Sequence, residues 1–212
     1  QYGFRASALW EQEKAALVRK LEKLVALDFS EKSPVAAHFG ETHRRPYRIE
    51  TGFSEAGSIH IRISPDLEPL RVTGKVDRID QQGKRVIVVD YKSGSSELNT
   101  SEMRRGRNYQ MMLYLRAVEQ ILENDPHPDR PTEIGGGFFW HLPRNKASGV
   151  FFVDSDHDRE AMQVAQARLA GQIIAGRRGD FAAEPNKAEQ GRCYKHCEFS
   201  QLCRISIANR GR

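Results

Sequence analysis

The sequence predicts a mixed α/β fold in which helices flank a central mixed sheet. A helical pattern at residues 8–27 is followed by several strand-like runs, then a second helix, further strands and a last helix. The run at 85–92, RVIVVDYK, is apolar on both faces, which is typical of a strand that is covered from both sides. A second strand-like run, 72–79, precedes it across a short polar turn, so the two are expected to form a hairpin.

The elements before this hairpin are a helix and two strands. Residues 8–27 carry leucines and a tryptophan at helical spacing between Glu and Lys residues, so a packing helix is expected. Residues 30–45 are polar and favour a loop. Strands are expected at 46–53 and at 58–64, where apolar and polar residues alternate, and a turn bounded by prolines follows at 65–69.

A long helix is expected after the hairpin. Residues 93–101 are polar and favour a loop, and Ser101 suits the N-cap of a helix that runs from 102 to about 122. Three prolines within 124–132 end that helix. The remaining predicted elements are aromatic-rich strands at 134–142 and 149–153 and a helix at 155–176.

The composition limits the classes of partner and the cellular compartment that fit this chain. The 212 residues suffice for one well-buried domain, and no apolar run approaches the roughly 20 residues of a membrane span, so no membrane partner is expected. A net charge of +5 is compatible with a polyanionic partner. Three cysteines within eleven residues do not form a secreted disulfide framework, which favours the cytoplasm. The chain starts without methionine and is expected to be part of a longer polypeptide.

Asp77, Asp90 and Lys92 form the candidate chemical centre. Side chains alternate across a strand, so Asp90 and Lys92 emerge on one face where the apolar part of 85–92 stops. The hairpin would bring Asp77 within reach of the same cation. Two carboxylates and the backbone carbonyl of Tyr91 are the hard oxygen ligands that Mg2+ prefers. Beside such an ion, Lys92 could orient a water or stabilise a phosphoryl transition state, whereas the alternative is an ordinary surface Asp–Lys pair.

Three ordered motifs, GKVDRID, DYKSG and QMMLY, resemble the PD-(D/E)XK nuclease superfamily. Within it they are most similar to the RecB/AddB-type nuclease domain, which is also shared with CRISPR-associated nucleases. The matching residues are Gly74, Asp77, Arg78, Asp80, Asp90, Tyr91, Lys92, Gly94, Gln110 and Tyr114. Weaker matches are Glu50 and Phe53, in an E-x-x-F strand, the region of Trp10 and the C-terminal cysteines.

The resemblance implies a restriction-endonuclease-like core at residues 1–180 and an irregular, cysteine-containing tail at 181–212. It also implies Mg2+- or Mn2+-dependent hydrolysis of DNA phosphodiester bonds. By it, Asp77, Asp90 and the Tyr91 carbonyl would bind the metal, and Lys92 would be the catalytic lysine. Glu50 would be an additional acidic residue of the site.

The helix after the hairpin is expected to contribute to the same site. Gln110 and Tyr114 lie one helical turn apart, and in the family this pair borders the active site and helps to position DNA. Arginines near the motifs are expected to contact backbone phosphates, which gives affinity without sequence readout. They are Arg78, Arg104, Arg105 and Arg107.

The chain departs from the family at one metal ligand. The family usually carries a metal-binding histidine upstream in a G-x-x-x-H context, where this chain has Gly3 and Ser7. His38 and His43 lie in loop-like sequence and are poor substitutes. Either the histidine lies outside this chain, together with the N-terminal helix of the core, or the site works with fewer ligands. The isolated chain is therefore expected to be weakly active or inactive.

Cys193, Cys197 and Cys203 are spaced as C-x3-C-x5-C, which suits a soft metal or an iron–sulfur cluster. Many relatives hold a 4Fe-4S cluster with three cysteines here, spaced C-x2-C-x5-C, and a fourth far upstream. The fourth is absent from this sequence, so the cluster is expected only in a full-length protein. Zinc bound with the help of His196 and free thiols are the alternatives.

The sequence thus predicts a metal-dependent DNA nuclease domain, an exonuclease, in a larger DNA-repair or recombination machine. A helicase domain or subunit is the expected partner. The rival is a non-catalytic DNA-end-binding or scaffolding module that keeps the nuclease fold. The intact D…DYK…QxxxY set argues against it, because a scaffold gains nothing from a lysine beside two carboxylates. An interaction domain that is stabilised by a metal bound to the C-terminal cysteines is a third and weaker hypothesis, given the number and spacing of the cysteines.

Overall fold

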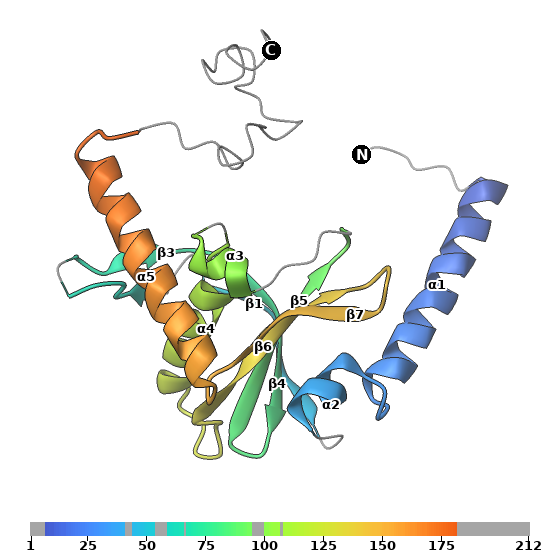
Figure 1. The fold of residues 1–212 in the computed structure, drawn as a ribbon. Coiled ribbons are helices and arrows are strands. Elements are labelled where there is room, and N and C mark those ends of the chain that lie inside the picture. The colour runs from blue at the N-terminus through green and yellow to red at the C-terminus, as the bar shows by residue number, and fades with distance from the viewer. Residues whose placement is uncertain are drawn as a thin grey trace, which may run out of the picture. The chain divides into compact units, whose positions relative to one another are not determined.

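Five strands of mixed direction build the main sheet, and helices lie on its faces (Figure 1). The structure, a computed structural model, describes residues 7–40, 44–53, 59–65, 67–94, 100–106 and 108–181. It divides into two units, residues 1–170 and 171–212, and the sheet belongs to the first. The expected mixed α/β fold with a central sheet is confirmed.

The described elements follow one another as helices, strands, helices, strands and a helix. The helices are α1 (Ala8–Asp28), α2 (Pro34–Phe39), α3 (Thr100–Arg104), α4 (Gln110–Glu123) and α5 (Asp156–Arg177). The strands are β1 (Arg45–Gly52), β2 (Ile59–Ile61), β3 (Leu70–Val72), β4 (Lys75–Gln82), β5 (Arg85–Lys92), β6 (Glu133–His141) and β7 (Lys146–Phe152). No described helix combines the length and the apolar character that crossing a membrane requires.

The sheet has the order β1-β4-β5-β6-β7, and only its β5–β6 pair is parallel. A parallel pair needs a crossover, and the chain makes it through α3 and α4. The C-terminal ends of β5 and β6 therefore lie side by side at one edge of the sheet. β2 and β3 form a separate two-stranded sheet.

The β4–β5 hairpin is as expected: the strands pair antiparallel, and Gly83 at φ 60° supports the tight turn. Residues 86–89 of β5 are fully buried, so both faces of the strand are covered. On one face Ile87 and Val89 pack with Phe138 and Trp140 of β6. On the other, α4 lies close to β6, where a Cβ at Gly137 would sit 2.6 Å from the Met111 sulfur. The missing side chain at Gly137 thus allows α4 to approach the sheet.

Two predicted elements are each split in the structure. The helix expected from 102 to 122 is broken into α3 and α4 around Gly106, which adopts φ 68°. Gln110 consequently starts α4 instead of lying inside a long helix. The strand expected at 72–79 is divided between β3 and β4 because the chain passes from the small sheet to the main one.

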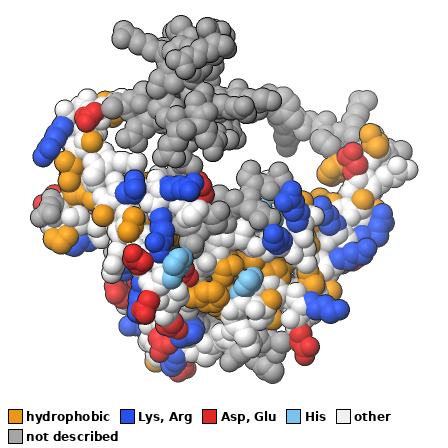
Figure 2. Space-filling model, in the orientation of Figure 1, with side chains coloured by type: hydrophobic (Ala, Val, Ile, Leu, Met, Phe, Trp, Pro, Cys, Tyr) orange, Lys and Arg blue, Asp and Glu red, His pale blue; other side chains and the backbone are white. Residues whose placement is uncertain are grey.

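Residues 30–45, expected to be a loop, contain the short helix α2. The Ser33 hydroxyl accepts a hydrogen bond from the Ala36 amide at 3.0 Å, Pro34 occupies the first turn, and Gly40 ends the helix at φ 77°. Val35 is fully buried against the sheet. In Figure 2, hydrophobic side chains gather in the middle of this face around α2.

Helix α1 forms where it was predicted, and Ser7 caps it by accepting from the Trp10 amide at 3.1 Å. Its packing is more limited than the sequence suggests. Leu24 and Leu27 near its C-terminal end contact the core cluster of the sheet. The large apolar side chains of the earlier turns are instead exposed: Leu9, Trp10, Leu17, Val18 and Leu21.

Candidate active site

The predicted acidic residues and the lysine lie at the adjoining ends of β4 and β5. The Asp77 carboxylate accepts a hydrogen bond from the Tyr91 amide at 2.9 Å, which ties the two strands together. The Lys92 ammonium lies 2.8 Å from Asp90 Oδ2. The structure therefore brings Asp77, Asp90 and Lys92 into one small region of the sheet.

Asp90 is a buried carboxylate whose two oxygens have different partners. Its side chain is 4% exposed, and its Oδ1 accepts from the Gln110 amide at 3.2 Å. Its Oδ2 faces the Lys92 ammonium at 2.8 Å, and no other hydrogen-bond donor among the described residues is recorded for that oxygen. Burial raises the pKa of Asp90, Lys92 opposes this shift, and the charge of Asp77 adds to it. A buried oxygen of this kind fits a bound cation.

Gln110 and Tyr114 on α4 complete the cluster. Gln110 accepts from the Lys92 ammonium at 2.8 Å and donates to the Tyr114 hydroxyl at 2.8 Å as well as to Asp90. Burial is the main cause that raises the pKa of the Tyr114 hydroxyl. Lys92 also lies over the Phe139 ring, 5.1 Å from its centroid. The ammonium is thus held by an anion, an amide and an aromatic face.

The donor set limits the kind of metal that fits. Within the residues that the structure describes, no group of three or more His, Cys, Asp or Glu side chains is arranged to hold a metal ion. Asp77 and Asp90 are the two carboxylates that lie together here, and the Tyr91 carbonyl stays a predicted third oxygen. Such a set suits Mg2+, which keeps several waters, and does not suit a closed zinc site.

Glu50 lies on β1 at the position opposite Asp77, between the pairs Ile49–Arg78 and Thr51–Val76. Its backbone adopts φ 53°, which is rare for a residue other than glycine. Its carboxylate is exposed and forms an ion pair with Lys75. Its role as an additional acid of the site stays a prediction.

Arg78 does not have the surroundings of a DNA-binding residue. It follows Asp77 directly, so it points to the opposite face of β4, and it is only 6% exposed. Its guanidinium pairs with Asp28 and Asp80 and donates to the Tyr91 hydroxyl. The donors of Arg78 are thus used inside the protein, and a contact between Arg78 and DNA stays a prediction.

The other predicted arginines differ in their availability. Arg104 donates to the carbonyl of His157 at 3.0 Å and pairs with Glu160, so α3 is tied to the start of α5. Arg105 is 61% exposed on its side chain and has a long 3.8 Å contact with Glu102. Arg107 lies outside the described residues. Of the three, Arg105 is the described residue best exposed to an external phosphate.

Several sequence predictions lie where the structure gives no description. These are the three cysteines, His196 and His43. An iron–sulfur cluster, a zinc site and free thiols all stay predictions. His38 belongs to the last turn of α2 and not to a loop.

Sequence reasoning missed Phe139, which lies beneath the Lys92 ammonium. It belongs to β6, where it is in register with Asp90. No motif marks it, because its place depends on which strand pairs with β5.

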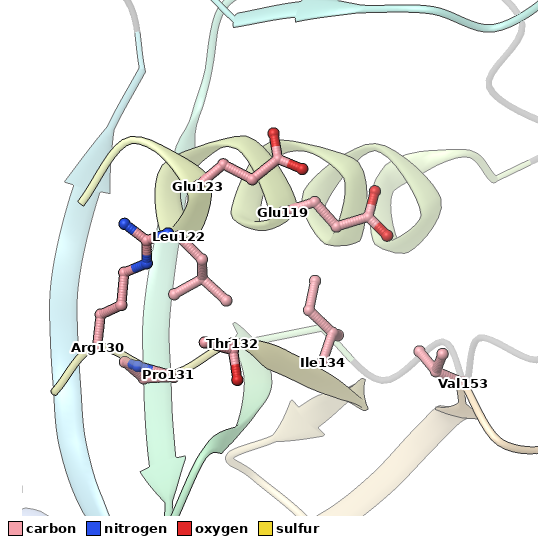
Figure 3. Close-up of a pocket in the computed structure, with 8 residues that line it drawn as sticks. All are labelled: Glu119, Leu122, Glu123, Arg130, Pro131, Thr132, Ile134 and Val153. Atoms are coloured by element: carbon pink, nitrogen blue, oxygen red, sulfur yellow. The ribbon is translucent and has the colours of Figure 1, made fainter. Parts of the chain in front are cut away.

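A separate hollow of about 220 Å3 contains none of the predicted site residues (Figure 3). Its walls come from the C-terminal half of α4, the following connection, and the ends of β6 and β7: Glu119, Leu122, Glu123, Arg130, Pro131, Thr132, Ile134 and Val153. Glu119 is already paired with Arg116 at 2.8 Å. This hollow therefore offers no second set of free carboxylates comparable with that on β4 and β5.

We expect Asp90→Asn to raise the free energy of unfolding at neutral pH by about 1 kcal/mol. The raised pKa means that the folded chain binds the Asp90 proton more tightly than the unfolded chain, so this group costs stability once pH exceeds its usual pKa. The gain should disappear in acid, where both states are protonated. Urea unfolding at acid and neutral pH, with exposed Asp129→Asn as control, measures it. A loss of stability at neutral pH would contradict the argument.

Comparison with known proteins shows which proteins this chain resembles. The sequence profile of the PD-(D/E)XK nuclease superfamily matches residues 4–204. An ATP-dependent helicase/deoxyribonuclease subunit of Acetivibrio thermocellus is 27% identical over 150 residues, which are 66% of this chain and 13% of that protein. Proteins of the same name are 28% identical over 134 residues in Exiguobacterium sibiricum and 35% over 113 residues in Clostridium acetobutylicum.

These two alignments cover 61% and 50% of this chain, and 12% and 10% of the two relatives. The chain thus spans only about an eighth of the length of the relatives that it matches. The family profile, in contrast, extends over nearly the whole chain and includes both acidic strands and α4. The chain belongs to the PD-(D/E)XK nuclease superfamily.

Proposed function

We propose that this chain is a divalent-metal-dependent deoxyribonuclease domain that acts as an exonuclease. The observation that carries the proposal is the buried Asp90 carboxylate, which lies beside Asp77 and Lys92 and whose pKa is raised by burial and by the Asp77 charge. A buried carboxylate beside a second carboxylate costs free energy, and a bound divalent cation would lower this cost. Membership of a nuclease superfamily supports the same function.

Asp77, Asp90 and the Tyr91 carbonyl would hold Mg2+ or Mn2+ in this proposal. The ion would neutralise charge on a phosphoryl oxygen and lower the pKa of a bound water. Lys92 would place its ammonium against the charge that develops on the scissile phosphate. Gln110 would keep that ammonium in place, since it is hydrogen-bonded to Lys92 and Asp90 together.

We propose further that the chain works within a larger helicase–nuclease in the cytoplasm. The relatives carry both activities in their names, and they are much longer than this chain. A partner with helicase activity would supply unwound DNA ends to the nuclease. Arg105 is the described arginine that we expect to contact the DNA backbone.

The test is DNA degradation by the purified chain with Mg2+ or Mn2+, compared with chelator. We expect loss of linear DNA only when the metal is present, with little cleavage of closed circular DNA. Asp90→Ala is the control for a contaminating nuclease, because it removes the central carboxylate. Binding of DNA ends without cleavage, even within the larger protein, would instead favour a scaffolding module. Cleavage of circular DNA would refute the exonuclease part alone.

A further inference from the structure

His141 is a buried histidine at the edge of the proposed active site. It is the last residue of β6 and is 2% exposed. In the parallel β5–β6 pair it is in register with Lys92. No motif in the sequence includes it, and the proposed hydrolysis gives it no chemical step.

Both nitrogens of the His141 ring have partners. Nδ1 lies 3.1 Å from the carbonyl oxygen of Gly94, and Nε2 lies 2.7 Å from the Ser148 hydroxyl on β7. A carbonyl oxygen only accepts hydrogen bonds, so Nδ1 must carry a proton and donate it. The Ser148 hydroxyl can donate to Nε2 or accept from it. The ring is thus fixed from two sides, and its Nδ1–H holds the backbone two residues after Lys92.

The end of β6 contacts Lys92 itself at two further points. The Leu142 amide donates to the carbonyl of Lys92 at 3.0 Å, and the Phe139 ring lies under the Lys92 ammonium. The backbone on the C-terminal side of Lys92 is therefore clamped by His141 and its neighbour. Because Lys92 is near a strand end, a backbone shift there would move the ammonium away from Asp90 and Gln110.

We propose that His141 is a positioning residue for Lys92: by donating to the Gly94 carbonyl, it fixes the backbone that sets the place of the ammonium. The inference rests on the proposed nuclease function for its kinetic test. If His141 only filled space, any side chain of similar volume that kept the fold would serve. A positioning role depends instead on one hydrogen bond.

Two amide variants separate the two contacts of the ring. In His141→Asn the amide nitrogen can occupy the place of Nδ1 and donate to Gly94, while the contact with Ser148 is lost. In His141→Gln the amide reaches Ser148, while the donor to Gly94 is lost. Ser148→Ala is the matched control. We expect kcat to fall about tenfold in His141→Gln with KM for DNA unchanged, and to stay within about threefold in the other two variants.

The melting temperature of each variant is measured first, and His141→Phe, which keeps the bulk but loses both contacts, replaces His141→Gln should the latter not fold. Equal kcat values for the Asn and Gln variants would overturn the proposal. So would a loss of kcat/KM in His141→Gln that comes from a higher KM with kcat unchanged.

Labelling of Lys92 by an amine reagent, read by mass spectrometry, provides a second test. It should be several-fold faster in His141→Gln than in the parent and in His141→Asn, and equal rates would also overturn the proposal. Absence of cleavage by the parent, also within the larger protein, would refute the nuclease function alone, since the labelling does not depend on it.

Discussion

Replacing Lys92 by alanine should lower the rate of DNA cleavage by about 10³-fold, because a positioned charge next to the reacting phosphate is lost. The ammonium is in contact with Asp90, Gln110 and the Phe139 ring, so it is held in place before substrate arrives. Its side chain is 28% exposed, and the fold should survive its removal. Single-turnover cleavage of labelled linear DNA with Mn2+ measures the rate, and circular dichroism verifies the fold.

The same variant should change the pH dependence of any remaining activity. Lys92 lowers the pKa of Asp90, so its removal leaves burial and the Asp77 charge to raise that pKa further. The ionised carboxylate that binds a metal then appears only at higher pH, and the acidic limb of the pH–rate profile should move upward. Lys84→Ala, at an exposed lysine in the hairpin turn, is the control and should match the parent. Retention of a third or more of the activity in Lys92→Ala would contradict a catalytic role.

The β4–β5 hairpin and its polar ends could be predicted because the relevant signals are local. A buried strand is apolar on both faces, a glycine permits the turn, and strict alternation puts Asp90 and Lys92 on one face. The alternation rule also applies to Asp77 and Arg78. Because the two are consecutive in a strand, Asp77 and Arg78 point to opposite faces, and the sequence alone indicates this separation.

The rest depends on contacts between distant segments. Phe139 and His141 approach Lys92 only because β6 pairs parallel with β5, and nothing in the β6 sequence specifies that register. The break between α3 and α4 follows from the conformation of Gly106, which helical periodicity alone does not reveal. The short helix α2 did have a local signal, since a capping serine, a proline and a later glycine mark its two ends.

Replacing Arg78 by methionine should lower the free energy of unfolding by about 3–5 kcal/mol, because it leaves two buried carboxylates with Arg44 as their one remaining cation in the described group. Arg78 is paired with Asp80 through two contacts of 2.6 Å, and with Asp28, while Arg44 is paired with the same two carboxylates. No member of this group of four is more than 8% exposed. Burial alone would lower the pKa of Arg78, but the hydrogen bonds that its guanidinium donates to Asp80 and Asp28 outweigh burial and raise the pKa.

The charge balance of these four residues also predicts an order of stability among the variants. Arg78→Met leaves one cation for two buried anions, and Asp80→Leu leaves two cations for one anion. The double variant keeps a single neutral pair, Arg44 with Asp28, and should be more stable than either single variant, since a balanced apolar replacement can be nearly neutral. Urea unfolding of the parent, both single variants and the double variant gives the coupling free energy.

A partly exposed pair provides the matched control. Arg116 and Glu119 on α4 are 2.8 Å apart, but their side chains are 35% and 43% exposed, so Arg116→Ala should lower the free energy of unfolding by less than about 1 kcal/mol.

The buried group lies on the face of β4 opposite Asp77, and Arg78 reaches β5 through the Tyr91 hydroxyl at 2.9 Å. Because the Tyr91 amide is in turn bound by Asp77, a folded Arg78→Met chain should also cleave DNA more slowly. Strictly additive losses in the two single variants would mean that the four charges do not act as one unit, and the predicted order of stabilities would then be wrong.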